Sequence, residues 1–206
     1  MIVIVDYGLG NLASVQNMLH KVGGECIISG DPDVIAEAER LILPGVGFFA
    51  TGMRNMRERG IVAALDHAVL RQRRPVLGIC LGMQLMARHG QEGDALGLAW
   101  FDADVVRFDQ KRMGAAKVPH MGWSVIAPRY DHPVLPMSDN EERFYFVHTY
   151  YAVCERPADV LADCDHGYTF TCVIAKDNII GVQFHPEKSH RFGMALMQRF
   201  IDWIPA

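Results

Sequence analysis

The sequence is poor in cysteine, has no excess of positive charge and contains no long apolar run. Five of its 206 residues are cysteines, an odd number, and no two of them form a C-x-x-C pair. This usage disfavours a disulfide framework and a zinc site, and it is typical of free thiols in a reducing compartment. The formal charge of −4 argues against a general nucleic-acid binder, which would carry a basic surface. No run approaches the roughly 18 apolar residues of a membrane span.

The first residues also lack the features of a targeting signal. Residues 1–8 read MIVIVDYG, in which four apolar residues meet an aspartate at once and no basic segment precedes them. This pattern predicts a buried strand instead of a signal peptide. No phosphate-binding loop or ATP motif is found. We therefore expect a cytoplasmic protein that uses no cofactor and no metal and contacts neither a membrane nor nucleic acid.

Apolar runs and helical spacing alternate in the first half of the chain. The runs predict strands at 2–5, 26–29, 41–44 and 75–79. Between them, the spacing of apolar residues predicts helices at 12–22, 33–40 and 61–72, and one more after Cys80. Such alternation indicates a mostly parallel central sheet with helices on both faces, which is a three-layer α/β sandwich.

The second half of the chain is rich in predicted β-structure. Strands are expected at 144–153, 169–175 and 179–184, and a tight turn at 176–178 joins the last two into a hairpin. Periodic apolar residues then predict a C-terminal helix. Because no repeat or linker divides the chain, we expect a single domain over residues 1–206, whose parallel sheet is followed by an antiparallel, β-rich C-terminal half.

A dinucleotide site is one alternative for the first strand and its loop. Gly8, Gly10 and Ala13 have the spacing of a loose G-x-G-x-x-A fingerprint, and Asp31 lies where a ribose-binding acid is expected. However, two residues separate the apolar strand from the first glycine, and Asn11 has the position of a helix N-cap. The fingerprint is therefore weak.

Cys80 lies between two glycines at a predicted strand-to-helix turn. Residues 78–82 read GICLG, the G-x-nucleophile-x-G form of a nucleophile elbow, in which small neighbours permit a sharp turn. The start of the following helix favours the thiolate, which is the reactive form. Cysteine is also common as an inert core residue, so a base elsewhere in the chain has to decide between the two roles.

The segment FHPEKS at 184–189 offers such a base at the end of an apolar strand. In an extended segment, residues i and i+2 project to the same side, so Glu187 can reach the imidazole of His185. Pro186 between them favours extended backbone at His185 and removes a backbone donor. Cys80, His185 and Glu187 therefore form a candidate set of nucleophile, base and orienting residue.

With these residues, the sequence resembles the class I glutamine amidotransferases, and within them the glutaminase subunits of imidazole glycerol phosphate synthase. The resemblance spans nearly the whole chain and is carried by VDYGLGNLASV (5–15), LPGVG (43–47), GICLGMQ (78–84), KVPHMGW (117–123), YFVHTYY (145–151) and GVQFHPEKS (181–189). It implies the flavodoxin-like amidotransferase fold, glutamine as the substrate, and a catalytic triad of Cys80, His185 and Glu187. Ser124 and Thr149 depart from the asparagine and serine that are usual in the family.

The resemblance also implies the surroundings of the triad. The Leu81 N–H and the loop at Val46 and Gly47 would form the oxyanion hole, and Leu81 and Gly47 would also contact the substrate. Gln84 lies one helical turn after Cys80 and would bind glutamine, the alternative being a solvated side chain. The pocket would also be lined by His148, Thr149 and Tyr150, which follow a predicted strand. Tyr150 equally fits simple packing.

A further implication of the resemblance is a partner, the HisF cyclase, a (β/α)₈ barrel bound as a heterodimer. It would use the ammonia to make imidazole glycerol phosphate and an aminoimidazole carboxamide ribotide (AICAR) in histidine biosynthesis. The implied interface includes His120, Trp123 and Lys188. The first two also fit a core, and the third also fits a solvated cation.

Two other functions stay open from the sequence. One is a paralogous glutaminase subunit that supplies ammonia to a different synthase, such as a surface-sugar amidotransferase. The other is a catalytically silent module that only binds a partner. The complete triad argues against the second of these.

Overall fold

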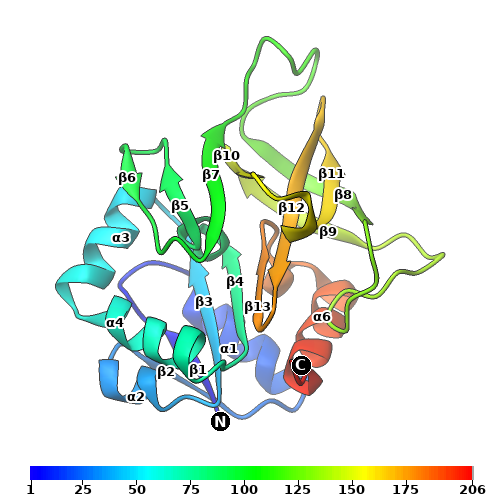
Figure 1. Cartoon of the computed structure of the whole chain (residues 1–206). Helices are drawn as coiled ribbons and strands as arrows, with labels where there is room; N and C mark the ends of the chain where they lie inside the picture. Colours follow the sequence, from blue (N-terminus) through cyan, green and yellow to red (C-terminus); the bar gives the residue numbers. More distant parts are fainter. Residues whose placement is uncertain (206) are drawn as a thin grey trace.

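The chain folds around one large sheet that is covered by helices on both faces (Figure 1). This computed structural model describes residues 1–205. Its first half contains the strands β1 (Ile2–Val5), β2 (Cys26–Ser29), β3 (Arg40–Gly45) and β4 (Val76–Cys80). The helices of this half are α1 (Leu12–Lys21), α2 (Pro32–Ala36), α3 (Phe49–Glu58), α4 (Ile61–Asp66), the π-helical turn η1 (His67–Arg71) and α5 (Leu81–Leu85).

The second half consists mainly of strands. They are β5 (Ala87–Gly90), β6 (Ala95–Leu96), β7 (Phe101–Arg107), β8 (His120–Pro128), β9 (Arg143–His148), β10 (Tyr150–Cys154), β11 (Val160–Asp165), β12 (Thr169–Lys176) and β13 (Ile179–Val182). The 3₁₀ turns η2 (Pro157–Asp159) and η3 (Pro186–Lys188) and the helix α6 (His190–Asp202) are the remaining elements.

The order of the strands joins the two halves into one sheet. The path across it is β2-β1-β3-β4-β13-β12-β10-β7-β5-β6, with β11 paired to β12 and β8, and β8 paired to β9. The strands from β2 to β13 along this path are parallel, whereas from β13 through β12 and β10 to β7 each strand is antiparallel to its neighbour. The predicted fold class, a mostly parallel sheet between helices with an antiparallel C-terminal half, is confirmed.

Alternate side chains of the parallel strands enter two separate apolar cores. Ile2 and Ile4 of β1 belong to the cluster that contains α1 and α6, whereas Val3 and Val5 belong to the cluster that contains α2, α3 and α4. Successive residues of a strand point to opposite faces, so a strand that is covered on both faces needs a continuous apolar run. This is why the run at residues 2–5 identified the strand.

Several predicted boundaries were wrong. The helix expected at 33–40 is the shorter α2, which begins after Asp31, whose side chain accepts a hydrogen bond from the Asp33 N–H at 2.9 Å. It ends early because Arg40 already pairs with Ile2 in the sheet. The run at 144–153 divides at Thr149 into two strands, because β9 pairs with β8 and β10 pairs with β7 and β12. The helix α3 and the strands β5, β6, β7, β8 and β11 were not predicted.

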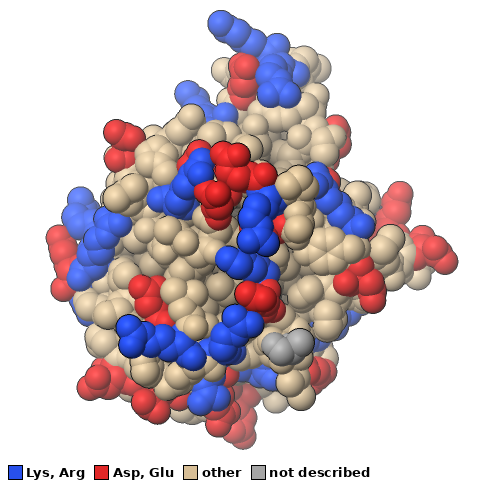
Figure 2. Space-filling model, viewed as in Figure 1, with Lys and Arg blue, Asp and Glu red and all other residues tan. Residues whose placement is uncertain are grey.

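The surface carries charges of both signs. On the face shown in Figure 2, lysine and arginine side chains lie among aspartates and glutamates and form no continuous basic area. Among residues 1–205, no helix has both the length and the apolar character needed to cross a bilayer.

Candidate active site

Cys80 is the last residue of β4 and lies directly before α5. Its backbone has φ 54° and ψ −109°, a conformation that L-residues adopt rarely and that is the sharp turn of a nucleophile elbow. The two flanking glycines are required for steric reasons. A Cβ on Gly82 would lie 1.7 Å from the Leu43 carbonyl oxygen, and one on Gly78 would lie 2.8 Å from the Met83 nitrogen.

His185 and Glu187 form a buried hydrogen-bonded pair next to this turn. His185 Nδ1 lies 2.7 Å from Glu187 Oε1, and both side chains are almost completely buried. The backbone at His185 is extended, as Pro186 predicted, but Pro186–Lys188 form a 3₁₀ turn instead of the expected extended segment. The pair therefore meets across a turn. Because the carboxylate accepts the Nδ1–H, the Nε2 atom of a neutral ring is free to accept a proton.

The protonation of His185 depends on Cys80 as well as on Glu187. Burial is the largest effect and lowers the pKa of the imidazole, whereas the interactions with Cys80 and Glu187 raise it, to about 9 in total. These interactions favour the protonated form of the ring, the form that can later donate a proton. The three residues are thus arranged for a thiolate–imidazolium pair that is oriented by a carboxylate.

A cavity of about 170 Å³ opens in front of Cys80. Its lining contains every residue that the resemblance implied for the oxyanion hole and the substrate: Val46, Gly47, Leu81, Gln84, His148, Thr149 and Tyr150. Cys80 itself, Glu92 and Val147 complete the lining. Both were missed: Glu92 lies in none of the motifs, and Val147 lies within YFVHTYY but was not assigned to the pocket.

The loop after β3 reaches the elbow through the register of the sheet. Gly45 of β3 pairs with Cys80 of β4, so Val46 and Gly47 follow beside the nucleophile. Gly47 has φ +129°, a conformation that favours glycine. Leu81 begins α5, so its N–H belongs to the first turn, where backbone donors have no partner within the helix.

The polar side chains around the cavity are linked by hydrogen bonds. Gln84 Nε2 donates to the Tyr150 carbonyl oxygen and to Gln183 Oε1, both at 3.0 Å. His148 Nδ1 donates to the same Tyr150 carbonyl at 2.8 Å, and His148 Nε2 lies 3.0 Å from His120 Nδ1. Burial is the main cause that lowers the pKa of His148, to about 3.

Of the three residues that were expected at a partner interface, only Trp123 and Lys188 are exposed. His120 is only 2% exposed and bonds to His148 and to Ser124 Oγ, so it is a core residue, and its prediction as a surface contact was wrong. It is buried because these polar partners satisfy both of its ring nitrogens. Trp123 is 43% exposed. Lys188 is exposed, with Nζ 5.8 Å from the centre of the Tyr145 ring.

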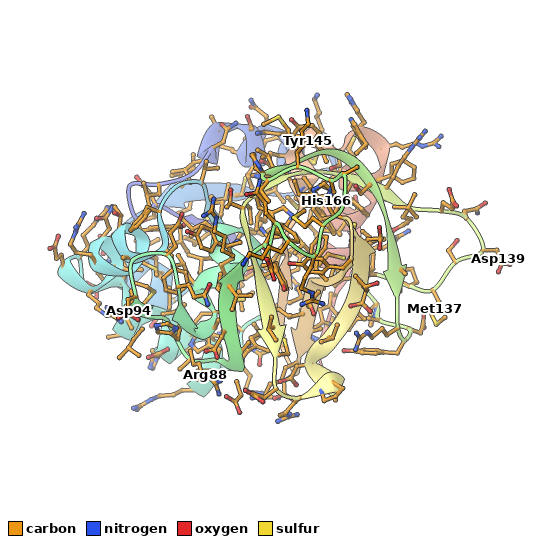
Figure 3. The ribbon with its side chains drawn as sticks, turned by 90° about the horizontal axis from the view of Figure 1, so that it is seen from above. Arg88, Asp94, Met137, Asp139, Tyr145 and His166 are labelled. Carbon is orange, nitrogen blue, oxygen red and sulfur yellow. The ribbon has the colours of Figure 1, made fainter. Side chains whose placement is uncertain are left out.

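Trp123 belongs to a face of β8 that exposes apolar side chains. Met121 and Val125 flank it at two-residue spacing and are 62% and 44% exposed. Tyr145 of β9 lies opposite Trp123 in the ladder. Arg88, which forms ion pairs with Asp104 and Glu155, lies on the opposite side of the view in Figure 3 from Tyr145. Exposed apolar faces of this kind mark contact surfaces.

The dinucleotide alternative is not supported by the structure. Asp31, the candidate ribose ligand, caps α2. The Gly8 N–H, which would bind a phosphate in a dinucleotide site, instead donates to Asp6 Oδ1 at 2.9 Å. Asn11 precedes α1, although its side chain makes no capping hydrogen bond.

Comparison with known families agrees with this site. The chain matches the family model of the class-I glutamine amidotransferases over residues 3–203, and it therefore belongs to that family. The chain is 48% identical to imidazole glycerol phosphate synthase subunit HisH 2 of Pseudomonas aeruginosa, over 99% of the chain and 100% of that protein. It is 45% identical to HisH 2 of Methanococcus maripaludis and to HisH of Sulfurimonas denitrificans, each over 98% of both chains. The resemblance stated from the sequence motifs is confirmed.

Solved structures share the fold at lower identity. A putative GMP synthase protein from Thermoplasma acidophilum superimposes with a TM-score of 0.71 at 20% identity, covering 98% of this chain and 92% of the other. PurLQS from Thermotoga maritima gives a TM-score of 0.71 at 16% identity, covering 98% and 96%. At these identities the likeness concerns the fold alone.

Proposed function

We propose that the chain is the glutaminase subunit of imidazole glycerol phosphate synthase. It hydrolyses glutamine to glutamate and ammonia and passes the ammonia to the HisF cyclase, which makes imidazole glycerol phosphate and AICAR in histidine biosynthesis. The observation that carries the proposal is the position of Cys80 on a strained elbow, beside the buried His185–Glu187 pair and at the wall of a cavity. The identity of 48% to a HisH protein supports the choice of synthase.

The reaction follows from the arrangement of the triad. The Cys80 thiolate attacks the side-chain amide carbon of glutamine, and His185 holds the thiol proton and delivers it to the leaving ammonia. The product of this step is a thioester between Cys80 and the glutamyl group. A water molecule then attacks the thioester, its proton passes through His185, and glutamate leaves. Glu187 keeps Nε2 of the ring directed at these atoms.

Two backbone groups stabilise the negative charge that develops on the amide oxygen. One is the Leu81 N–H at the start of α5, and the other comes from the loop at Val46 and Gly47 beside the elbow. Each such donor is worth roughly 3–4 kcal/mol in comparable sites. Val46 is exposed, and a partner that docks over this loop can act on it directly.

The cavity offers complementary groups to an amino acid. Glu92 is an acidic side chain in the lining and suits the α-ammonium group of glutamine, while one of its oxygens accepts the Phe49 N–H at 2.9 Å. Gln84 uses both hydrogens of Nε2 for Tyr150 and Gln183, so only its Oε1 is available to the substrate. It therefore accepts from an N–H of glutamine. The backbone of 148–150 closes the other side of the pocket.

The heterodimer with HisF follows from the chemistry of the product. Ammonia that escapes into neutral water is protonated and lost as a nucleophile, so the glutaminase has to work on its synthase. Trp123 with its apolar neighbours and Lys188 supply the contact surface on this chain. The cytoplasm is the proposed location, because the free cysteines of residues 1–205 fit a reducing compartment.

Glutamate release tests the proposal directly. The chain is assayed with saturating glutamine alone, then with HisF, and then with the nucleotide ligand of HisF. We expect slow release by the chain alone and a rise mainly in kcat at each addition, because docking completes the oxyanion hole. Cys80→Ser is the control and should release no glutamate while remaining folded. A full rate from the chain alone would contradict the activation, and no release under any condition would contradict the function.

A second candidate function is supply of ammonia to a different synthase, such as a surface-sugar amidotransferase. The relatives from Pseudomonas aeruginosa and Methanococcus maripaludis are both named HisH 2, a numbered copy. Ser124, a departure from the family pattern, lies on β8 next to Trp123 of the proposed interface. Assay of the chain with each candidate synthase separates the two functions, since only the true partner should raise glutamate release.

A further inference from the structure

Gln183 is a fully buried polar residue beside the nucleophile, and none of the steps above uses it. It follows β13 directly and continues its pairing, because its N–H donates to the Cys172 carbonyl at 2.8 Å. Gln183 and His185 lie two residues apart in the bent segment that follows β13. Gln183 Nε2 lies 3.7 Å from Cys80 Sγ. The cysteine sulfur is thus approached by an amide as well as by an imidazole.

The orientation of the Gln183 amide is fixed by a chain of hydrogen bonds that starts at a backbone carbonyl. The Tyr150 carbonyl can only accept, so the Gln84 atom that faces it must be the NH₂ group. The same NH₂ group lies 3.0 Å from Gln183, whose facing atom must therefore be the oxygen. The other end of the Gln183 amide, directed at Cys80, is then necessarily a donor.

A second bond makes this starting point rigid. The Tyr150 carbonyl also accepts the Nδ1–H of His148 at 2.8 Å, so both of its lone pairs are occupied. Thr149 separates β9 from β10 at this position, and each strand is held by its own ladder. Neither Gln84 nor Gln183 can reverse its amide without losing a hydrogen bond inside the protein, where an unsatisfied group is costly.

We propose that Gln183 positions the Cys80 sulfur and stabilises its thiolate, with Gln84 and the Tyr150 carbonyl fixing the direction of its amide. A neutral amide donates to the thiolate but does not compete for the proton, which His185 takes. The proposal deepens the proposed function, because it adds a residue that contacts the reacting sulfur. It also gives Gln84 a second role, as the link that orients Gln183.

The pH dependence of Cys80 alkylation tests this role without any turnover of glutamine. Iodoacetamide is the probe, and the modification of Cys80 is followed by mass spectrometry of its peptide, so that the other cysteines do not interfere. In Gln183→Met the donor is lost at similar volume, and we expect alkylation at pH 7 to slow by about tenfold, since a hydrogen bond to a charged group is worth roughly that factor or more. The midpoint of the profile should move to higher pH. Gln183→Glu places an acceptor at the sulfur and should move it further.

A matched control exists at the other end of β13. Asn178 is also a buried amide, and it donates to the carbonyls of Val69 and Arg74, at the end of β13 that is remote from Cys80. Asn178→Asp therefore repeats the change from amide to acid and should leave the alkylation profile of Cys80 unmoved. If Gln183→Glu fails to fold by circular dichroism, Gln183→Met carries the test alone. Profiles of folded Gln183 variants that superimpose on that of the parent chain would overturn the proposal.

The link through Gln84 is tested by combining substitutions. Gln84→Met should slow alkylation by less than Gln183→Met, because the donor remains but loses its fixed direction. The double variant should be no slower than Gln183→Met alone, since the two side chains act as one unit. Additive effects would overturn the link. A parent chain that is alkylated normally but releases no glutamate with HisF would contradict the proposed function and leave the role of Gln183 intact.

Discussion

The strained backbone at Cys80 makes a prediction about stability that is independent of activity. The residue has φ 54° and ψ −109°, which an L-residue adopts at a cost of about 1–3 kcal/mol and which glycine adopts freely. Cys80→Ala keeps this strain and removes only the sulfur. Cys80→Gly removes the strain as well. The difference between the two variants therefore isolates the backbone contribution.

The expected difference is the sum of two opposing effects. At an ordinary position, glycine is less stable than alanine by about 0.5–1 kcal/mol, because it gains more freedom in the unfolded chain. At Cys80, relief of the strain exceeds this loss, and we expect the glycine variant to be more stable by about 1 kcal/mol. For a chain of 206 residues this corresponds to a rise in Tm of about 2–4 °C.

Urea unfolding of the two variants measures the difference, with a second cysteine as the control. Cys164 of β11 is also buried, and its φ is not positive. Cys164→Gly should therefore be less stable than Cys164→Ala, which is the opposite order. If Cys80→Gly is less stable than Cys80→Ala by the usual amount, the elbow stores no strain and the reasoning is refuted.

Three further predictions concern the triad, a buried histidine and the exposed face. Glu187→Gln should retain more reactivity of Cys80 with a glutamine-analogue electrophile than His185→Ala, since it loses only the orientation of the base; equal and complete loss would contradict these roles. Burial is the main cause that lowers the pKa of His120 to about 4, below the value of about 6.5 expected when unfolded. Between these two pKa values only the unfolded state binds the proton, so the urea midpoint of the parent chain should decrease as the pH is lowered from 6.5 to 4. The decrease should be smaller in His120→Gln, and an equal decrease in the two proteins would contradict the prediction. Trp123→Ala should weaken HisF binding at least tenfold in a fluorescence titration, while the unfolding free energy of the chain alone stays within about 1 kcal/mol; unchanged binding would remove Trp123 from the interface.

The sequence was sufficient for the parts of the site that depend on local pattern. The GICLG turn and the HPE segment each predicted a geometry that a few neighbouring residues determine, and both geometries are observed apart from the 3₁₀ turn after His185. The helix α3 had a detectable signal, since Phe49, Met53 and Met56 recur at helical spacing and are buried. The glycine at position 52 obscured it. A Cβ there would lie 3.2 Å from Leu85, so this glycine permits α3 to pack closely against α5.

Other features depend on partners that are distant in the sequence. The sequence left His120 open between a core position and a surface beside Trp123. It is buried, and there it donates to His148 from one ring nitrogen and accepts the Ser124 hydroxyl at the other. Glu92 reaches the pocket from the loop between β5 and β6 and carries no motif. A residue of this kind is identified only when the strands that bring it to the site are known.

The register of the parallel strands explains why the site assembles where it does. Gly45 of β3 pairs with Cys80 of β4, and Val182 of β13 pairs with Ile79, so Gln183 lies one residue beyond the last pair, level with the nucleophile. Three strands therefore deliver the oxyanion loop, the thiol and the amide to one edge of the sheet, the carboxyl edge on which α/β proteins build their sites. In the order β3-β4-β13, Leu41 of β3 pairs with Val76 of β4 about 35 positions further along the chain, and Val76 pairs with Ile179 of β13 about 100 positions further. Local patterns do not encode such pairings. With that order known, the motif GVQFHPE predicts that its glutamine and its histidine, two residues apart, both face the cysteine.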